Sequence, residues 1–222
     1  MIVSIMQPAY MPWLGYFDRI AKSDVHVVLN DVTMDKSSKT KFANRNKIRT
    51  QQGWAWLTVP LKSFSQSSRV LINEIEIAPD NNWREKHLKT LHFNYSNSVY
   101  YSDYSTYFES FYKEKWSSLE PMLLESTRFL LNTLNLNTPL IPSTELSVMS
   151  KKSNLILDIC RNISATTYLS GPFGRHYLDK DTFERAGIEL QFHDYFHPTY
   201  DQLYDGFMRR RRPPRCRPKL EA

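Results

Sequence analysis

The chain has 222 residues, of which 41% are hydrophobic and 23% are charged, so it can bury a core and is not disordered overall. It contains no run of about 18 apolar residues, which argues against a transmembrane helix, and its N-terminus lacks the pattern of a secretory signal. There are two cysteines, Cys160 and Cys216, which argues against a disulfide framework. We therefore expect a cytoplasmic protein.

The formal net charge of +6 comes from the end of the chain. Residues 209–222 contain seven basic residues and one acidic residue, which leaves 22 basic and 22 acidic residues in the first 208. Nucleic-acid binding would therefore depend on this tail alone. We expect a single α/β domain over residues 1–207, with a helical insertion at about 80–135, and a disordered basic tail over residues 208–222.

The first 31 residues predict a βαβ unit. An apolar strand at residues 2–5 leads through a Pro- and Gly-containing loop at 7–17 into a short helix at 18–22, and a second strand follows at 25–29. Loops at the carboxyl ends of parallel strands are where α/β proteins bind ligands. We interpret the polar and basic residues 32–50 as a loop that leads into a short element.

The middle of the chain changes from strand to helical patterns. Strands are predicted at residues 54–60 and 70–77. A helix capped by Asp80, a second at 103–116 and a third opening at Ser117 follow, and the prolines of residues 135–143 indicate a break.

The second half predicts a helix at 155–163, a strand at 166–169, a short helix at 179–186 and a strand at 188–192. This element order is typical of an α/β fold with a mostly parallel sheet.

The loop at 7–17 offers several groups to a ligand. Gln7 carries an amide, Gly15 permits close backbone approach, and Tyr10 and Tyr16 present rings with hydroxyls. The alternative is a rigid, proline-fixed turn that packs on the sheet.

Asp31 and Arg45 are candidates for charged groups of a site. Asp31 follows the second strand, where a carboxylate can bind a hydroxyl, a metal or an amine, and the alternative is an Asx turn or a helix cap. Arg45, between Asn44 and Asn46, can clamp a phosphate or carboxylate, and the alternative is a solvated basic loop.

A glycine-rich loop follows the strand at 166–169. Such a loop can cradle an anion with backbone N–H groups, although it matches neither a Walker loop nor GxGxxG. Its candidate residues are Ser170, Gly171, Gly174 and Arg175, with Tyr177 nearby.

His197, Tyr200 and Gln202 place three polar side chains within six residues after the last strand. His197 is suited to be a general base, and the alternative is a structural histidine. We assign His87 to the core, because it shares a helical stripe with Trp83 and Leu91. The sequence has no Cys/His metal spacing and no GxSxG, so we predict no metal site and assign no cofactor.

Together these strings resemble the WbqC-like family of bacterial proteins, many of which are encoded among genes for O-antigen and other surface polysaccharides. The resemblance covers residues 1 to about 207. Its carriers include Gln7-Pro8-x-Tyr10-x-Pro12, Gly15-Tyr16-Phe17, Asn30-Asp31-Val32, Asn44-Arg45-Asn46, Leu57-Thr58-Val59-Pro60, Tyr168-Leu169-Ser170-Gly171, Gly174, Tyr177-Leu178, His197, Tyr200 and Gln202.

The resemblance implies a cytosolic protein of surface-polysaccharide (lipopolysaccharide) biosynthesis. The opening unit also looks like that of nucleotidyltransferase-type folds, so we expect a sheet of nucleotidyltransferase-like or Rossmann-like type. Their HxGH signature is missing, because Trp13-Leu14-Gly15-Tyr16 contains no histidine.

Our leading hypothesis is a transferase that modifies an activated sugar by acyl, aminoacyl or related group transfer. Arg45 and the loop from Gly171 to Gly174 would hold an anionic group, and Asp31 or His197 would act as acid or base. Tyr10, Tyr16 and Tyr200 would contact the sugar. The partner would be a small molecule, an activated sugar or an acyl donor. The alternatives are a non-catalytic binding or scaffold protein of the same pathway, and nucleic-acid binding through the tail.

Overall fold

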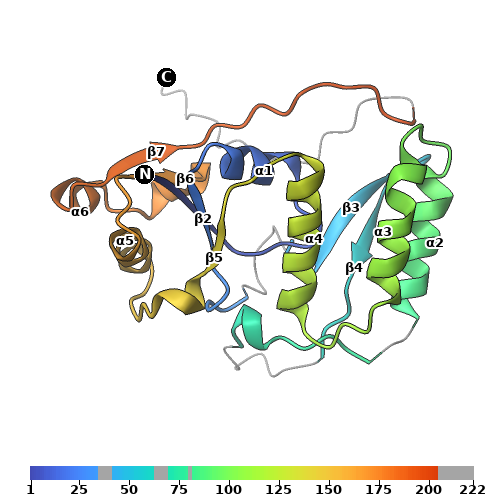
Figure 1. Cartoon of the computed structure of the whole chain (residues 1–222), viewed down its shortest axis with the longest axis horizontal. Helices are drawn as coiled ribbons and strands as arrows, with labels where there is room; N and C mark the ends of the chain where they lie inside the picture. The colour runs from blue at the N-terminus through green and yellow to red at the C-terminus, as the bar shows by residue number, and fades with distance from the viewer. Residues whose placement is uncertain (35–41, 63–69, 80–81, 205–222) are drawn as a thin grey trace, which may run out of the picture.

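A computed structural model of the chain describes residues 1–34, 42–62, 70–79 and 82–204. Its centre is a five-stranded parallel sheet in the order β5-β2-β1-β6-β7 (Figure 1). The strands are β1 (Ile2–Met6), β2 (Val25–Val28), β5 (Leu140–Pro142), β6 (Thr167–Ser170) and β7 (Glu189–Phe192). The predicted α/β class and parallel sheet are confirmed, and the arrangement is of the Rossmann-like or nucleotidyltransferase-like type.

Helices cover both faces of the sheet, because side chains alternate along each strand. On β1, Val3 and Ile5 pack in the core cluster of α5 (Ser153–Asn162) and α6 (Lys180–Arg185). Met6 packs against Tyr16, Phe17 and Ile20 of α1 (Leu14–Ala21) and Leu131 of α4 (Leu119–Thr133). Burial on both faces explains why β1 is apolar along most of its length, whereas the edge strand β7 alternates exposed Glu189 and Gln191 with half-buried Leu190 and Phe192.

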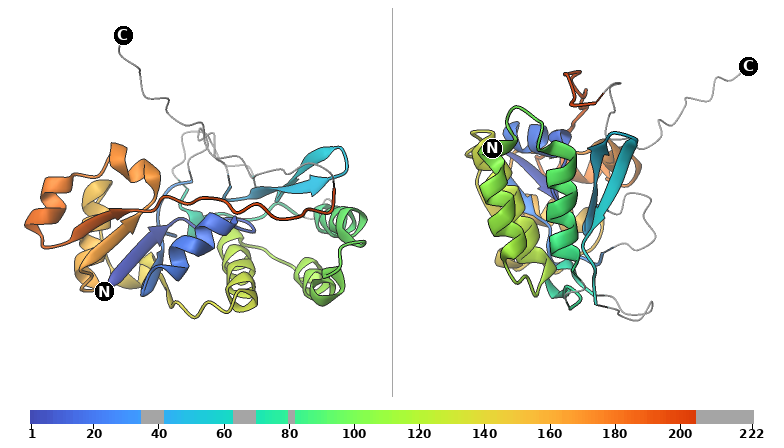
Figure 2. Two further views of the ribbon diagram at one scale, coloured as in Figure 1. Left: turned by 90° about the horizontal axis from the view of Figure 1, so that it is seen from above. Right: turned by 90° about the vertical axis from the view of Figure 1, so that its right-hand side faces the viewer.

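A second lobe lies between β2 and β5 in the sequence. It contains the hairpin of β3 (Arg45–Thr50) and β4 (Gly53–Thr58), followed by α2 (Trp83–Tyr95) and α3 (Tyr101–Lys113). The helical insertion is therefore present as predicted. Both views in Figure 2 place the hairpin on the side of the molecule opposite α4.

Four local predictions are wrong. Helix α1 begins at Leu14, inside the predicted loop, because Tyr16, Phe17 and Ile20 form one buried face. The short element expected at the end of residues 32–50 is the six-residue strand β3, which was not recognised as a strand because its buried side, Asn46, Ile48 and Thr50, is too polar. The break predicted at 135–143 contains β5, a three-residue strand at the edge of the sheet, where its terminal Pro142 is tolerated.

The fourth is the strand predicted at 70–77, which is a 3-10 turn (η1, Ile72–Glu74) flanked by isolated bridges. Leu71, Glu76 and Ile77 each form an isolated bridge with a different segment. Apolar and polar residues therefore alternate here, but no continuous strand pairing forms. The Asp80 cap and the basic tail from residue 208 lie outside the described residues.

Two buried histidines join the layers. His26 of β2 hydrogen-bonds Ser4 Oγ through Nδ1 at 2.9 Å, and its Nε2 lies 3.5 Å from the hydroxyl of Tyr16. His87 of α2 hydrogen-bonds the Tyr10 hydroxyl through Nδ1 at 3.2 Å. Burial and the nearby Arg19 charge lower the pKa of His26 to about 3, and burial lowers the pKa of His87 to about 4.

We expect the free energy of unfolding to decrease as the pH falls from 6.5 towards 4. Both imidazoles are neutral in the fold, whereas in the unfolded chain they bind protons with the ordinary histidine pKa of 6.5. The unfolded state therefore takes up more protons in this window, with a combined loss of roughly 3 kcal/mol or more. Urea unfolding at a series of pH values measures it.

The variant His87→Gln should flatten this pH dependence, whereas His176→Gln, at an exposed position, should not. If the unaltered protein, His87→Gln and His176→Gln all show the same dependence of the unfolding free energy on pH, His87 is not held neutral in the fold.

Candidate functional site

The strand order gives the sheet a switch point between β1 and β6. The connections after these two strands leave towards opposite sides, which is the arrangement at which doubly wound proteins bind ligands, and we call the edge where β1 and β6 end the crevice. β1 ends at Met6, and β6 pairs beside it and ends at Ser170. The exposed Gln7 and the backbone of Gly171 therefore lie at this crevice, together with the buried Ser170.

Arg19, which no sequence motif indicated, lies over Gly171. A Cβ built on Gly171 would be 2.4 Å from Nη1 of Arg19, so the guanidinium occupies the space that the missing side chain leaves. In the part of the chain that the structure describes, no Asp or Glu pairs with Arg19. Burial lowers its pKa, with partial compensation from Tyr168, Tyr16 and Tyr177, but an arginine remains charged.

A half-buried arginine without a carboxylate partner is a favourable place for an external anion. The sequence did not indicate Arg19, because a single basic residue in the helix predicted at 18–22 is ordinarily a solvated side chain. Only the packing of α1 against the β6 loop brings its guanidinium to the crevice.

A histidine–carboxylate pair lies next to Arg19. His193, directly after β7, is 6% exposed, and its Nε2 donates to Asp18 Oδ2 at 2.5 Å. Burial raises the pKa of Asp18, but hydrogen bonds from Lys22 and His193 outweigh this effect and hold it below its ordinary value. The carboxylate fixes the proton on Nε2, so Nδ1 of His193 carries the lone pair of the neutral ring.

Asp31 belongs to a hydrogen-bonded network at the ends of β2 and β5. Ser143 Oγ donates to Asp31 at 2.5 Å, and Asn30 donates to Glu120 at 2.5 Å and to Thr144 at 3.2 Å. Every polar group of the Asn30 side chain has a partner, and Asp31 is half-buried. The network joins the start of α4 to the sheet.

Tyr10 and Tyr16 are buried, at 0% and 1% exposure. The Tyr10 hydroxyl lies between His87 and the hydroxyl of Tyr112, and the Tyr16 hydroxyl faces His26. Gly15 lies in α1, where a Cβ would be 2.7 Å from the Tyr195 ring. In this conformation the two tyrosines join secondary-structure elements and do not line the crevice.

Asn44, Arg45 and Asn46 lie on or next to the hairpin. Asn46 donates to the carbonyl oxygens of Tyr10, at 3.0 Å, and of Met11. Asn44 donates to Val59 O at 2.8 Å. Arg45 lies on the outer face of the hairpin, so the structure does not bring it to the loop at Gly171.

The glycine-rich loop forms the 3-10 helix η3 (Pro172–His176). A Cβ on Gly174 would be 2.0 Å from Ser170 Oγ and 2.8 Å from Leu178 Cδ1, so a larger residue would force these side chains to move. Arg175 pairs with Asp194 at 3.0 Å, and Tyr177 is 54% exposed near Arg19. The loop thus contributes backbone, and not Arg175, to the crevice.

His197, Tyr200 and Gln202 lie in residues 193–204, which we call the C-terminal strap. The strap runs from β7 to the second lobe, where the Tyr204 hydroxyl donates to Asn94 O at 2.8 Å (Figure 1). His197 Nδ1 donates to Pro198 O at 2.8 Å, and its ring stacks on Tyr200. The strap histidine that contacts α1 is His193, whose Nε2 lies 2.5 Å from Asp18 Oδ2, rather than His197.

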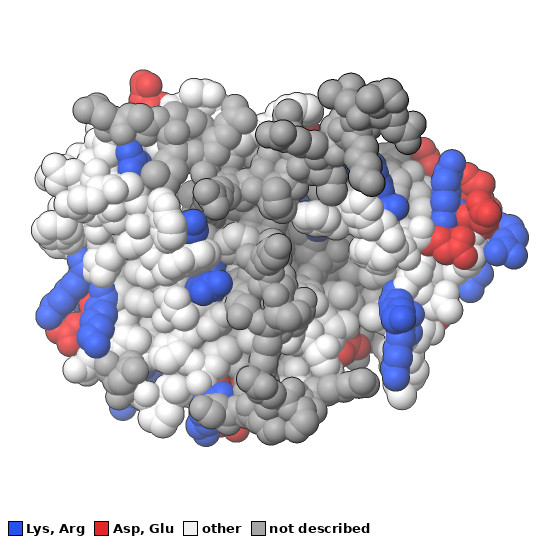
Figure 3. Space-filling model, turned by 180° about the vertical axis from the view of Figure 1, so that it is seen from behind, with Lys and Arg blue, Asp and Glu red and all other residues white. Residues whose placement is uncertain are grey.

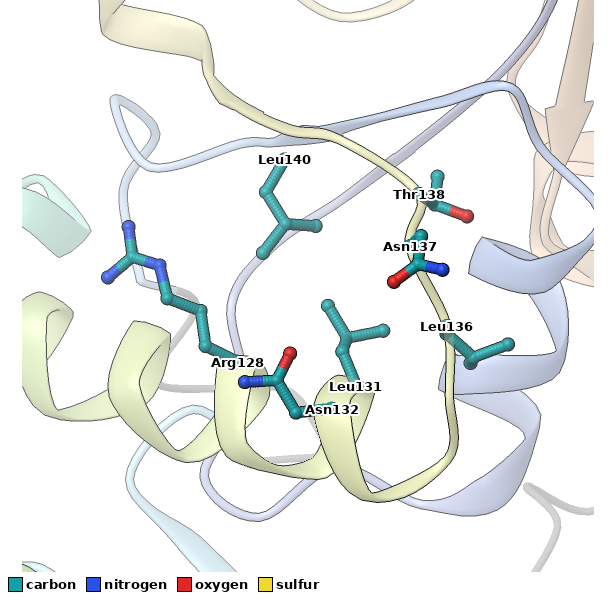
Figure 4. A pocket seen from close by; sticks show the side chains of 7 residues that line it. All are labelled: Arg128, Leu131, Asn132, Leu136, Asn137, Thr138 and Leu140. Carbon is teal, nitrogen blue, oxygen red and sulfur yellow. The ribbon is translucent and has the colours of Figure 1, made fainter.

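A shallow depression of about 300 Å³ lies elsewhere, at the end of α4 (Figure 4). It is lined by Arg128, Leu131, Asn132, Leu136, Asn137, Thr138 and Leu140. Residues 136–138 precede β5, so this depression is at the amino edge of the sheet, opposite the crevice. We do not assign it to the site.

Among the described residues, no group of three His, Cys, Asp or Glu side chains is arranged to hold a metal ion. The helices of the described ranges include none that is long and apolar enough to cross a membrane.

Comparison with known proteins places the chain in a family. The sequence model of the WbqC-like protein family matches residues 7–210. The chain belongs to the WbqC-like family. It is 32% identical over 210 residues to "Uncharacterized protein Rv1507c" of Mycobacterium tuberculosis (strain ATCC 25618 / H37Rv). The aligned region covers 92% of this chain and 87% of that protein. No solved structure matches it.

We expect Gly174→Ala to destabilise this WbqC-like protein by about 2 kcal/mol, because the added methyl group overlaps Ser170 and Leu178. Urea unfolding measures the loss. Ser170→Ala removes the closest of the overlapping atoms, so the double variant should recover part of it. Equal stability of Gly174→Ala and the unaltered protein would mean that this loop does not pack as described.

Proposed function

We propose that this protein is a transferase of surface-polysaccharide biosynthesis. It binds an activated sugar or an acyl donor by its phosphate groups and transfers an acyl, aminoacyl or related group. The observation that carries the proposal is the guanidinium of Arg19, which lies over Gly171 at the switch point with no carboxylate partner in the described ranges.

Phosphate is the group that nucleotide-sugars and acyl-CoA donors share. A planar guanidinium binds it with two parallel hydrogen bonds, and the bare backbone of a glycine allows it close approach. Gln7, exposed at the end of β1, adds an amide that can donate to the same ligand. Resemblance to a family associated with surface polysaccharides supports a sugar as the other part of the substrate.

His193 and Asp18 supply the acid–base function in this proposal. Asp18 holds the Nε2 proton at 2.5 Å, and Nδ1 accepts the proton of an acceptor hydroxyl or amine as it attacks the donor. The resulting imidazolium is stabilised by Asp18 and then protonates the leaving group. Asp31 and His197 are the alternative acid–base residues, because each carries a titratable side chain beyond a strand of the same sheet.

A non-catalytic sugar-binding protein is the second candidate. The hydrogen bonds of the Asn30–Asp31 network and the burial of Tyr10 and Tyr16 favour it, because side chains engaged in this way hold the fold together. This candidate predicts binding without turnover.

We expect Arg19→Ala to remove the thermal shift that nucleotide-sugars or acyl-CoA produce. A ligand at about 100 times its dissociation constant stabilises the protein by about 2.7 kcal/mol, and the shift disappears when the anion loses its partner. Arg161→Ala removes the same charge from the far surface of α5 and should leave the shift unchanged. A full shift with Arg19→Ala would contradict the proposal.

Gly171→Ala provides an independent test of the same contact. The new methyl group displaces the Arg19 guanidinium without removing its charge, so ligand affinity should fall by about tenfold while net charge stays constant. Isothermal titration with the ligand that gives the thermal shift measures this change.

We expect His193→Gln to lower turnover by about 100-fold or more and to leave donor binding within a few-fold, because an amide cannot accept and release the proton. Mass spectrometry of the modified sugar measures turnover. Binding with no product in either protein would favour the non-catalytic candidate, and full activity of His193→Gln would move the acid–base role to His197 or Asp31.

A further inference from the structure

The outer face of the β3–β4 hairpin carries alternating cations and tryptophans. The antiparallel register pairs Lys47 with Trp56 and Arg49 with Trp54, so all four side chains lie on one face. The opposite face, with Ile48 and Leu57, packs in the core of the second lobe. The hairpin therefore separates an apolar inner face from a basic and aromatic outer face.

The cations lie directly over the indole rings. The Lys47 ammonium is 3.3 Å from the centroid of Trp54 and 4.9 Å from that of Trp56, and the Arg45 guanidinium is 4.3 Å from the centroid of Trp56. Trp54 is 47% exposed and Trp56 is 36% exposed. Two adjacent indole rings that are partly exposed and flanked by cations form a surface of the kind in which aromatic binding contacts concentrate.

The rings continue from the hairpin to the site. Trp54 contacts Trp56 with a centroid distance of 5.8 Å, and Trp56 contacts Phe42 at 6.2 Å. Phe42 contacts Trp13 at 5.5 Å, directly before α1. We call Trp54, Trp56, Phe42 and Trp13 the aromatic track. It ends at the helix that carries Asp18 and Arg19.

We propose that the aromatic track, with Arg45 and Lys47 beside it, binds an extended anionic oligosaccharide and guides it to the crevice. This inference rests on the proposed function, since it names the class of the acceptor. The apolar faces of sugar rings pack on tryptophan, and carboxylates or phosphates along the chain pair with the cations.

An anionic glycan fits this face better than a nucleic acid does. The first 208 residues carry no net charge, whereas nucleic-acid binding depends on a strongly positive surface. Figure 3 shows the molecule from behind, and its described Lys and Arg side chains are spread over the face together with Asp and Glu rather than gathered into one patch. The tryptophans, not charge alone, distinguish the hairpin.

The test uses the full chain and a short oligogalacturonate as the probe, with titration calorimetry as the measurement. We expect Trp54→Ala and Lys47→Gln each to weaken binding by about tenfold. Phe93→Ala and Lys89→Gln remove an exposed ring and an exposed cation from α2 and should leave binding unchanged. A neutral malto-oligosaccharide of equal length should bind at least about tenfold more weakly than the anionic probe.

If these contacts only stabilise the hairpin, Trp54→Ala and Lys47→Gln will unfold at lower urea concentrations but keep the oligogalacturonate affinity of the unaltered protein. This result would overturn the proposal. Absence of oligogalacturonate binding would also overturn it, as would binding of oligouridylate in its place with loss on Trp54→Ala.

The variant Arg19→Ala separates the two proposals. Loss of the donor-induced thermal shift with retained oligogalacturonate binding supports both the crevice and the track. A retained donor shift in Arg19→Ala, with glycan binding that depends on Trp54, would overturn the proposed anion site and leave the track in place.

Discussion

Strand β1 is paired along both of its edges, and the positions of the other elements follow from this pairing. It is hydrogen-bonded to β2 on one side and to β6 on the other, in parallel register. Right-handed crossovers then require the two halves of the chain to wind in opposite directions from this strand. The crevice at Gln7 and Gly171 results from this divergence of the backbone and does not depend on particular side chains.

The connection from β1 to α1 couples the crevice to the second lobe. Its first half buries Tyr10 between His87 and Tyr112. The amide of Asn46 holds the carbonyl oxygens of Tyr10 and Met11, where Met11 has a left-handed φ of 44°. The hairpin and the crevice are therefore attached to the same short segment of chain.

The C-terminal strap makes a second connection between the lobes. At one end His193 binds Asp18 of α1, and at the other the Tyr204 hydroxyl binds Asn94 of α2. Between them the Tyr195 ring lies against Gly15, where only a hydrogen atom fits. A side chain at position 15 would displace this ring, and one at position 174 would displace Ser170 and Leu178, so these two glycines of the family pattern have a steric reason.

The order of residues was enough to establish the class of the fold, because apolar runs of strand length alternate with helical periodicity, and it located the loops that follow β1, β2 and β6. It did not reveal β3, whose buried side includes Asn46 and Thr50, or β5, whose three residues are too few for a period. The burial of Tyr10 and Tyr16 and the position of Arg19 over Gly171 emerged only from the packing of the folded chain. The physical reason is that burial and side-chain pairing depend on contacts between residues far apart in the chain, such as Asp18 with His193, which local patterns do not record.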